Sequence, residues 1–222
     1  MPSRKDLKKQ KEKTSQALIQ AALQLCAEEG YASLSLRSVA RKAGIAPTSF
    51  YRHFREIDEM GVAMVAQAKE VMDNCLAQAR KKMTFPAIKK SDSPAHLLKS
   101  IECMTRPFAE TFINFLKKNN QLLHLFFQER TGSSEAMRKA IFDATDQLTE
   151  LLAEDLKQLS ESSKNKLGDV RLISETMLTI VSSSGMEMLV HPKAKPGDIT
   201  GDITGRAIQK LNLLLLGALI YE

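Results

Sequence analysis

The sequence predicts an all-α protein of about nine helices, with a small three-helix domain at the N-terminus and a larger helical domain after it. Two observations favour this class. Apolar residues recur every three or four positions along most of the 222-residue chain, and valine and isoleucine follow the same spacing instead of alternating as they do in strands. Hydrophobic residues make up 43% of the chain, which is enough for a packed core.

Residues 1–13 are expected to form a basic arm ahead of the first helix, because they contain six Lys and Arg residues and few apolar ones. Such an arm can follow phosphates or enter the minor groove of DNA, and it can equally be a solvated tail. The first helix is predicted over residues 14–29, where Leu18, Ala22 and Leu25 share one stripe and Gly30 ends the helix.

Residues 33–60 predict two short helices, a tight turn between them and the start of a longer helix. Ser35 is a suitable N-cap for a helix over residues 36–43, and Gly44 favours the left-handed conformation that ends a helix. Pro47 fits the first turn of a second helix over about residues 46–54. This is the helix-turn-helix arrangement, whose second helix lies in the major groove of DNA. Two helices joined by a tight turn that only pack on the protein core, without binding DNA, would have the same spacing.

Charge distinguishes these two interpretations. Phe50 and Phe54 are four residues apart and are expected to point inward, which leaves a polar face without acidic residues: Thr48, Ser49, Tyr51, Arg52 and His53. Residues 1–55 hold 11 Lys and Arg against 4 Asp and Glu, whereas the rest of the chain holds 21 against 22. The positive excess around the motif favours a polyanionic partner, and therefore DNA binding.

The run AGIAPTSFYRHFREIDE at residues 43–59, preceded by EEGYASLSLRSVAR at residues 28–41, resembles the N-terminal domain of the TetR family of bacterial repressors. The resemblance implies a two-fold homodimer on a pseudo-palindromic, double-stranded operator, with half-sites about one helical turn apart or slightly more. It assigns base contacts to Thr48, Ser49 and Arg52, a thymine methyl contact to Pro47, and phosphate contacts to Tyr51 and His53, with help from Ser35 and Arg37. Ser49 departs from the pattern, because many members have glycine there.

A narrower resemblance is carried by APTSFYRHFRE and by QERTGSSEAMRKA at residues 128–140. Both segments resemble the repressors of unsaturated fatty-acid biosynthesis, the FabR type, and related acyl-CoA-sensing regulators of desaturation. This resemblance implies long-chain acyl-CoA or acyl-carrier-protein thioesters as effectors. It also implies that the regulated genes serve unsaturated fatty-acid biosynthesis.

Residues 14–55 are therefore predicted to be the DNA-binding domain, and residues 56–222 the ligand-binding and dimerisation domain. Apolar residues recur with helical spacing from residue 57 to residue 79, so one long helix is expected to connect the two domains. The last two helices, over residues 168–190 and 203–221, are expected to form the dimer interface, because the final one is apolar on nearly all sides.

Six of the nine phenylalanines fall between residues 108 and 142. Phenylalanine and methionine side chains at helical spacing usually form core, but the resemblance favours a tunnel for an acyl chain with an arginine near its mouth. The candidate ligand-binding residues, chosen by helical stripe, are Met104, Phe108, Phe112, Phe115, Phe126, Arg130, Met137, Met177 and Met188.

Two rival functions stay open on the sequence alone. A TetR-type repressor of a drug-efflux gene would have the same fold and would bind amphiphilic cations with acidic groups, for which Glu102, Glu110, Glu129 and Glu187 are candidates. A ligand-independent architectural protein would bind DNA with little sequence preference and would not respond to lipids.

Other classes are not expected. The longest apolar run has about 11 residues where a membrane span needs roughly 20, and no apolar segment of a secretory signal follows the basic start. Cys26, Cys75 and Cys103 lie at helical positions and suit small buried side chains in a reducing cytoplasm better than redox sensors. The chain has no nucleophile motif, phosphate loop or Cys/His cluster at metal spacing, so neither an enzyme nor a cofactor or metal site is predicted.

Overall fold

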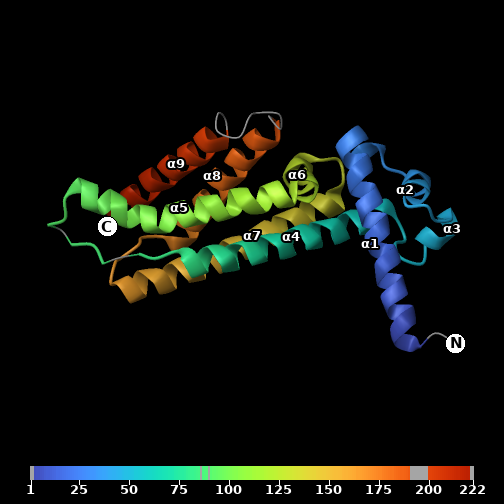
Figure 1. Cartoon of the computed structure of the whole chain (residues 1–222), viewed down its shortest axis with the longest axis horizontal. Coiled ribbons are helices and arrows are strands. Elements are labelled where there is room, and N and C mark those ends of the chain that lie inside the picture. Colours follow the sequence, from blue (N-terminus) through green and yellow to red (C-terminus); the bar gives the residue numbers. More distant parts are fainter. Residues whose placement is uncertain (1–2, 86, 90, 191–199, 221–222) are drawn as a thin grey trace. The chain divides into compact units, whose positions relative to one another are not determined.

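The computed structural model of the chain describes residues 3–85, 87–89, 91–190 and 200–220. Within these residues the chain forms nine α-helices, two short 3-10 helices and no β-strand, which confirms the predicted all-α class (Figure 1). The elements in chain order are α1 (Arg4–Glu29), η1 (Tyr31–Ser33), α2 (Leu36–Lys42), α3 (Pro47–Phe50), α4 (Ile57–Lys82), α5 (Pro94–Lys118), α6 (Asn120–Gln128), η2 (Glu129–Thr131), α7 (Glu135–Ser163), α8 (Val170–Val190) and α9 (Thr200–Ile220).

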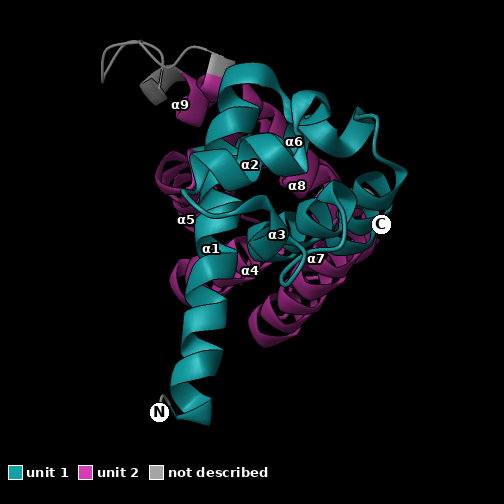
Figure 2. Cartoon of the chain, turned by 90° about the vertical axis from the view of Figure 1, so that its right-hand side faces the viewer, with its two compact units in different colours: residues 1–68, 121–144 teal, residues 69–120, 145–222 magenta. Residues whose placement is uncertain are grey.

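The chain divides into two compact units (Figure 2). Unit 1 comprises residues 1–68 and 121–144, and unit 2 comprises residues 69–120 and 145–222. Unit 1 therefore combines α1, α2, α3 and the start of α4 with most of α6 and the first turns of α7. These units do not coincide with the predicted domains, 14–55 and 56–222, and that functional division stays a prediction.

Helix α1 begins at Arg4 rather than at residue 14, so residues 4–13 are the first turns of a helix and not a separate arm. The cause is a capping box. The Ser3 hydroxyl accepts a hydrogen bond from the Asp6 backbone N–H at 3.2 Å, and the Asp6 carboxylate accepts one from the Ser3 N–H at 3.0 Å. Both groups satisfy free N–H donors of the helix end, and the lysine and glutamine residues that follow are good helix formers. Residues 1–2 of the predicted arm lie outside the described chain.

Tyr31 joins the N-terminal helices of unit 1 to α4. Its side chain is buried, and its hydroxyl lies 3.1 Å from both the Ile57 carbonyl oxygen and the Asp58 carboxylate. Gly61, one turn further along α4, leaves room for this hydroxyl: a Cβ atom at Gly61 would lie 2.4 Å from the Tyr31 oxygen and 2.7 Å from the Met137 sulfur. Residues from three distant parts of the chain thus pack at one point.

Unit 2 is built around α9, which packs against α5 and α8. At the start of helix α5 the Ser93 hydroxyl accepts a hydrogen bond from the His96 N–H at 3.3 Å, and Pro94 lies in the first turn. The α5–α9 contact contains a buried polar pair, because the Thr105 hydroxyl lies 2.6 Å from the Asn212 side-chain oxygen. A buried hydrogen bond of this kind favours one register of two helices over its neighbours.

The contact at Gly61 yields a stability prediction. Gly61→Ala should lower the free energy of unfolding by about 1–3 kcal/mol, because the added methyl group overlaps the Tyr31 hydroxyl and the Met137 side chain. Thermal and urea unfolding monitored by circular dichroism measure the effect. In a Tyr31→Phe background, Gly61→Ala should lower the free energy of unfolding by less, because the Tyr31 hydroxyl, which is nearest to the added methyl group, has been removed. Equal costs in the two backgrounds would contradict this packing.

Candidate nucleic-acid interface

The turn between α2 and α3 is fixed by backbone hydrogen bonds around Gly44. Gly44 has a φ of 71°, the left-handed conformation that glycine adopts without a steric penalty. The Ile45 N–H donates to the Ala40 carbonyl at 3.0 Å, and the Gly44 N–H donates to the Arg41 carbonyl at 3.1 Å. This pair of bonds is a Schellman motif, which satisfies the last carbonyls of α2 and reverses the chain. The predicted glycine stop is confirmed.

Ser35 caps the start of α2, as predicted. Its hydroxyl accepts a hydrogen bond from the Ser38 N–H at 3.1 Å, and the Ser38 hydroxyl accepts one from the Ser35 N–H at 3.0 Å. The two serines thus form a capping box. Ser35 and Arg37 are both exposed at this end of α2, where free backbone N–H groups favour an anion. Their contact with phosphate stays a prediction.

The segment predicted as one helix over residues 46–54 is shorter. Helix α3 spans Pro47–Phe50, and residues 51–53 continue as turns. The Arg52 N–H bonds the Ser49 carbonyl at 3.2 Å and the Phe54 N–H bonds the Phe50 carbonyl at 3.0 Å, so the chain keeps a helical course to Phe54. The bonds of Arg52 and His53 span three residues, as in a 3-10 helix, and that of Phe54 spans four.

Two phenylalanines anchor this segment in unit 1. Phe50 is fully buried, Phe54 is 6% exposed, and their ring centroids are 5.7 Å apart. An isolated helix of one turn is unstable in water, so burial of the two rings is what holds the segment in place. The predicted inward face is confirmed.

The opposite face of the segment points to solvent. Pro47, Thr48, Tyr51 and Arg52 are exposed, and Ser49 and His53 are half-buried. The Tyr51 side chain is 61% exposed although it is aromatic. An exposed row of a phenol, a guanidinium and a hydroxyl group supplies donors for both phosphate oxygens and base edges.

His53 closes this row with an unusual environment. Its Nδ1 atom is buried and has no hydrogen-bond partner among the described residues. Burial lowers the pKa of His53, and the positive charges of Lys11 and Arg52 lower it further. The imidazole is therefore neutral at pH 7, and it offers one N–H donor to a phosphate rather than a full positive charge.

Comparison with known proteins agrees with this geometry. Residues 18–64, which run from the middle of α1 into α4, match the model of the bacterial regulatory proteins of the tetR family. This N-terminal segment is therefore similar to the corresponding part of those regulators. The match contains all eight residues to which DNA contacts were assigned, but it does not test those contacts.

Solved structures share the fold of this chain over nearly its whole length. A putative TetR-family transcriptional regulator from Syntrophomonas wolfei has a TM-score of 0.71 at 15% identity, covering 95% of this chain and 99% of its own. The regulator FadR from Bacillus subtilis, solved in complex with stearoyl-CoA, has a TM-score of 0.67 at 18% identity, covering 91% and 98%. The multidrug binding protein EbrR, complexed with imidazole, has a TM-score of 0.59 at 19% identity, covering 90% and 94%.

The predicted ligand-binding residues fall in both units. Unit 1 contains Phe126, Arg130 and Met137, and unit 2 contains Met104, Phe108, Phe112, Phe115, Met177 and Met188. Most of them are buried, whereas Arg130 is exposed and Phe115 and Met188 are half-buried. Burial fits both a core and a closed tunnel, so the ligand assignment stays a prediction.

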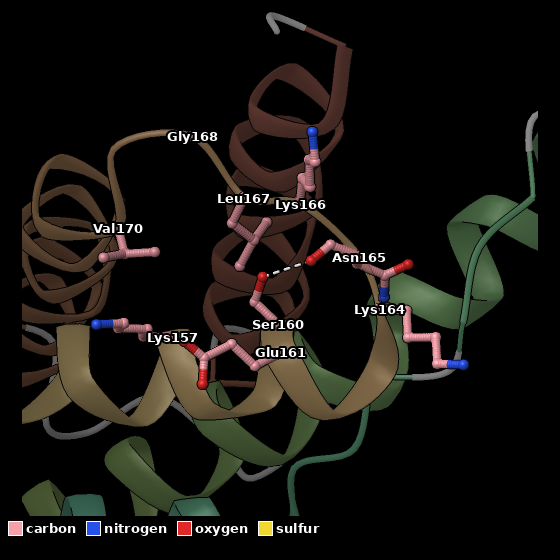
Figure 3. Close-up of a pocket in the computed structure, with 9 residues that line it drawn as sticks. All are labelled: Lys157, Ser160, Glu161, Lys164, Asn165, Lys166, Leu167, Gly168 and Val170. Carbon is pink, nitrogen blue, oxygen red and sulfur yellow. Dashed lines mark hydrogen bonds between the residues drawn. The ribbon is translucent and has the colours of Figure 1, made fainter.

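A pocket of about 530 Å³ lies in unit 2, between the end of α7 and the start of α8 (Figure 3). None of the predicted ligand-binding residues lines it. Its wall includes Lys157, Lys164 and Lys166, but Figure 3 shows their ammonium groups pointing away from one another. Ser160 donates a hydrogen bond to the Asn165 carbonyl at 2.6 Å and so is already engaged. The pocket therefore lacks convergent polar groups.

The three cysteines are free thiols. Burial raises the pKa of both Cys26 and Cys75 to about 12, with a nearby Glu129 charge adding to the effect at Cys26. These thiols stay protonated at neutral pH and are poor nucleophiles. In the described part of the chain no group of His, Cys, Asp and Glu side chains is arranged to hold a metal ion, and no helix could span a membrane.

Sequence reasoning missed Tyr31 as a positioning residue. Its position after Gly30 marks the end of α1, but nothing in the sequence pairs it with Asp58 across 27 residues. Burial and the Asp58 carboxylate raise the pKa of Tyr31, so the hydroxyl keeps its proton and donates. Tyr31 thereby ties the helix-turn-helix to the first turn of α4.

The exposed row predicts two separable defects in DNA binding. Arg52→Ala should change the discrimination between operator variants, because an arginine paired with a base is worth about 1–3 kcal/mol of discrimination. Tyr51→Phe should weaken binding to all DNA sequences about equally, because it removes a single phosphate hydrogen bond of about 1 kcal/mol. Fluorescence anisotropy on a set of single-substitution duplexes measures both. If both variants weakened every duplex equally, the assignment of Arg52 to a base would be wrong.

Proposed function

We propose that this protein is a TetR-type transcriptional regulator. It is a dimeric repressor that binds a pseudo-palindromic operator and releases or tightens it in response to long-chain acyl thioesters. The observation that carries the DNA-binding part is the exposed row Thr48, Tyr51 and Arg52 on a segment fixed by two buried phenylalanines. The segment is rigid on its inner face and polar on its outer face, which is what reading a major groove requires.

Within this proposal the residues have different roles. Thr48, Ser49 and Arg52 contact base edges, and Pro47 lies against a thymine methyl group. Tyr51, His53, Ser35 and Arg37 contact phosphates and so set the register without reading sequence. The half-burial of Ser49 makes its hydroxyl less available than that of Thr48, which is exposed.

The homodimer is proposed to form through α8 and α9. Exposed and half-buried leucine side chains on these two helices support this interface. Leu213 on α9 is 71% exposed, and Leu172 on α8 is 59% exposed. Leu214, Leu216 and Leu219 are only half-buried. A second copy would cover this apolar surface, and a two-fold axis would match the pseudo-palindromic operator.

A long-chain acyl-CoA or acyl-carrier-protein thioester is the proposed effector, and genes of unsaturated fatty-acid biosynthesis are the proposed targets. Three features support this proposal. Met104, Phe108 and Phe112 form a buried stripe of adaptable and aromatic side chains on α5. The segment at residues 128–140 resembles the FabR type. FadR, which has the same fold, was solved with stearoyl-CoA.

An anisotropy titration tests the effector. The duplex is the promoter of a fatty-acid desaturation or synthesis gene, and saturated and unsaturated long-chain acyl-CoA are added separately, with CoA alone as the control. We expect the Kd for DNA to change by about tenfold with one acyl chain and less with the other, because coupling between two sites is typically 1–3 kcal/mol. Tight, sequence-specific DNA binding whose Kd does not change with acyl-CoA would refute the lipid effector but not the proposed repressor.

A drug-binding repressor is the second candidate, favoured by one acidic residue. Glu102 and Glu110 pair with Arg106, and Glu187 pairs with Arg206. Glu129 is 7% exposed and has no ion-pair partner among the described residues, and burial raises its pKa. A buried carboxyl of this kind suits a lipophilic cation, and EbrR is a multidrug binding protein of the same fold. Binding of a cationic dye that Glu129→Gln abolishes would favour this candidate over the acyl thioester.

A further inference from the structure

Helix α1 begins before the segment that matches the tetR-family model. The family match begins at residue 18, whereas α1 begins at Arg4. All residues from Ser3 to Lys13 are exposed, including Leu7. Figure 2 shows these first turns reaching past the other helices of unit 1. At 1.5 Å per residue, residues 4–13 add roughly 15 Å of helix.

The positive charges on this extension are not spread evenly around the helix. Residues separated by steps of three and four lie on one face. One such face contains Arg4, Lys8, Lys11, Ser15, Leu18, Ala22 and Leu25. Its C-terminal part is buried in unit 1, and its N-terminal part is basic and exposed. The face of α1 that packs on the core therefore becomes cationic where the helix passes the core.

Lys11, on this cationic face, lies near the recognition segment, which comprises residues 47–54. Lys11 is close enough to His53 for its charge to act on the imidazole, and Arg52 acts on the same ring. Arg4 and Lys8 lie on the same face as Lys11, one to two turns closer to the N-terminus.

No interaction within the described chain neutralises these charges. None of the six cationic residues at positions 4–13 takes part in an ion pair there. Like charges four residues apart, such as Arg4 and Lys8, destabilise a helix by about 0.2–0.5 kcal/mol per pair. A polyanion would remove this repulsion, whereas water alone only screens it.

We propose that Arg4, Lys8 and Lys11 bind phosphates of the DNA backbone that flanks the groove occupied by the recognition segment. The proposal rests on the proposed DNA-binding function and lengthens its contact surface along the duplex. The contacts are with phosphates and carry no sequence preference, because long cationic side chains neutralise backbone charge without reading base edges.

Two matched triple variants test this. Arg4→Gln, Lys8→Gln and Lys11→Gln remove the charges on the proposed face. Lys5→Gln, Lys9→Gln and Lys13→Gln remove the same number of charges from the other side of the same turns. Glutamine has nearly the helix propensity of lysine, and circular dichroism checks that α1 stays formed. Anisotropy with a mixed-sequence duplex and with a promoter duplex, over a range of salt concentrations, gives Kd and its salt dependence.

We expect the first variant to bind both duplexes about tenfold more weakly than the second, and to reduce the slope of log K against log salt by about 0.9 per lost phosphate contact. The second variant controls for the lower net charge. Equal Kd values and slopes for the two variants would overturn the proposal while the DNA-binding function stands. A change in preference between the two duplexes would overturn it as well, since it would indicate base contacts. Failure of the unmodified protein to bind either duplex would refute the proposed function itself.

Discussion

Burial of Phe50 and Phe54 is the interaction on which the nucleic-acid interface depends. Helix α3 has a single turn and cannot be stable alone, so the exposed row beside it exists only because two aromatic rings fix the backbone from behind. The Schellman turn at Gly44 sets where that segment begins. Together these features leave Thr48, Tyr51 and Arg52 exposed on the opposite side of the segment.

The second constraint is that helices α1, α2 and α3 do not form a unit by themselves. Tyr31, Gly61 and Met137 meet in unit 1, which also includes residues 121–144. Helices α4 and α7 are continuous and each contributes residues to both units. A ligand that alters either helix in unit 2 therefore acts on an element that also belongs to unit 1, which contains the candidate nucleic-acid interface. This provides a physical basis for the proposed response to effectors.

Local features of this chain could be predicted because each has a local cause. Gly44 and Ser35 act within one or two turns, and the structure places both as the sequence predicts. The start of α1 was predicted wrongly. Ser3 and Asp6 have the spacing of a capping box, but the lysine-rich sequence of residues 1–13 was interpreted as an arm. The packing of Met137 beside Gly61 could not be predicted, since helical periodicity gives the buried face of a helix but not which distant helix covers it.

The central claim is that two copies of the exposed row bind two adjacent major grooves, and hydroxyl-radical footprinting on a bound promoter fragment tests it most directly. The account predicts two protected patches related by two-fold symmetry and about 10 base pairs or slightly more apart. Leu213→Glu, which places a charge on the proposed α9 interface, should abolish the paired pattern, whereas Leu151→Glu on α7 should keep it. A single patch, or protection without symmetry in the unmodified protein, would contradict the account.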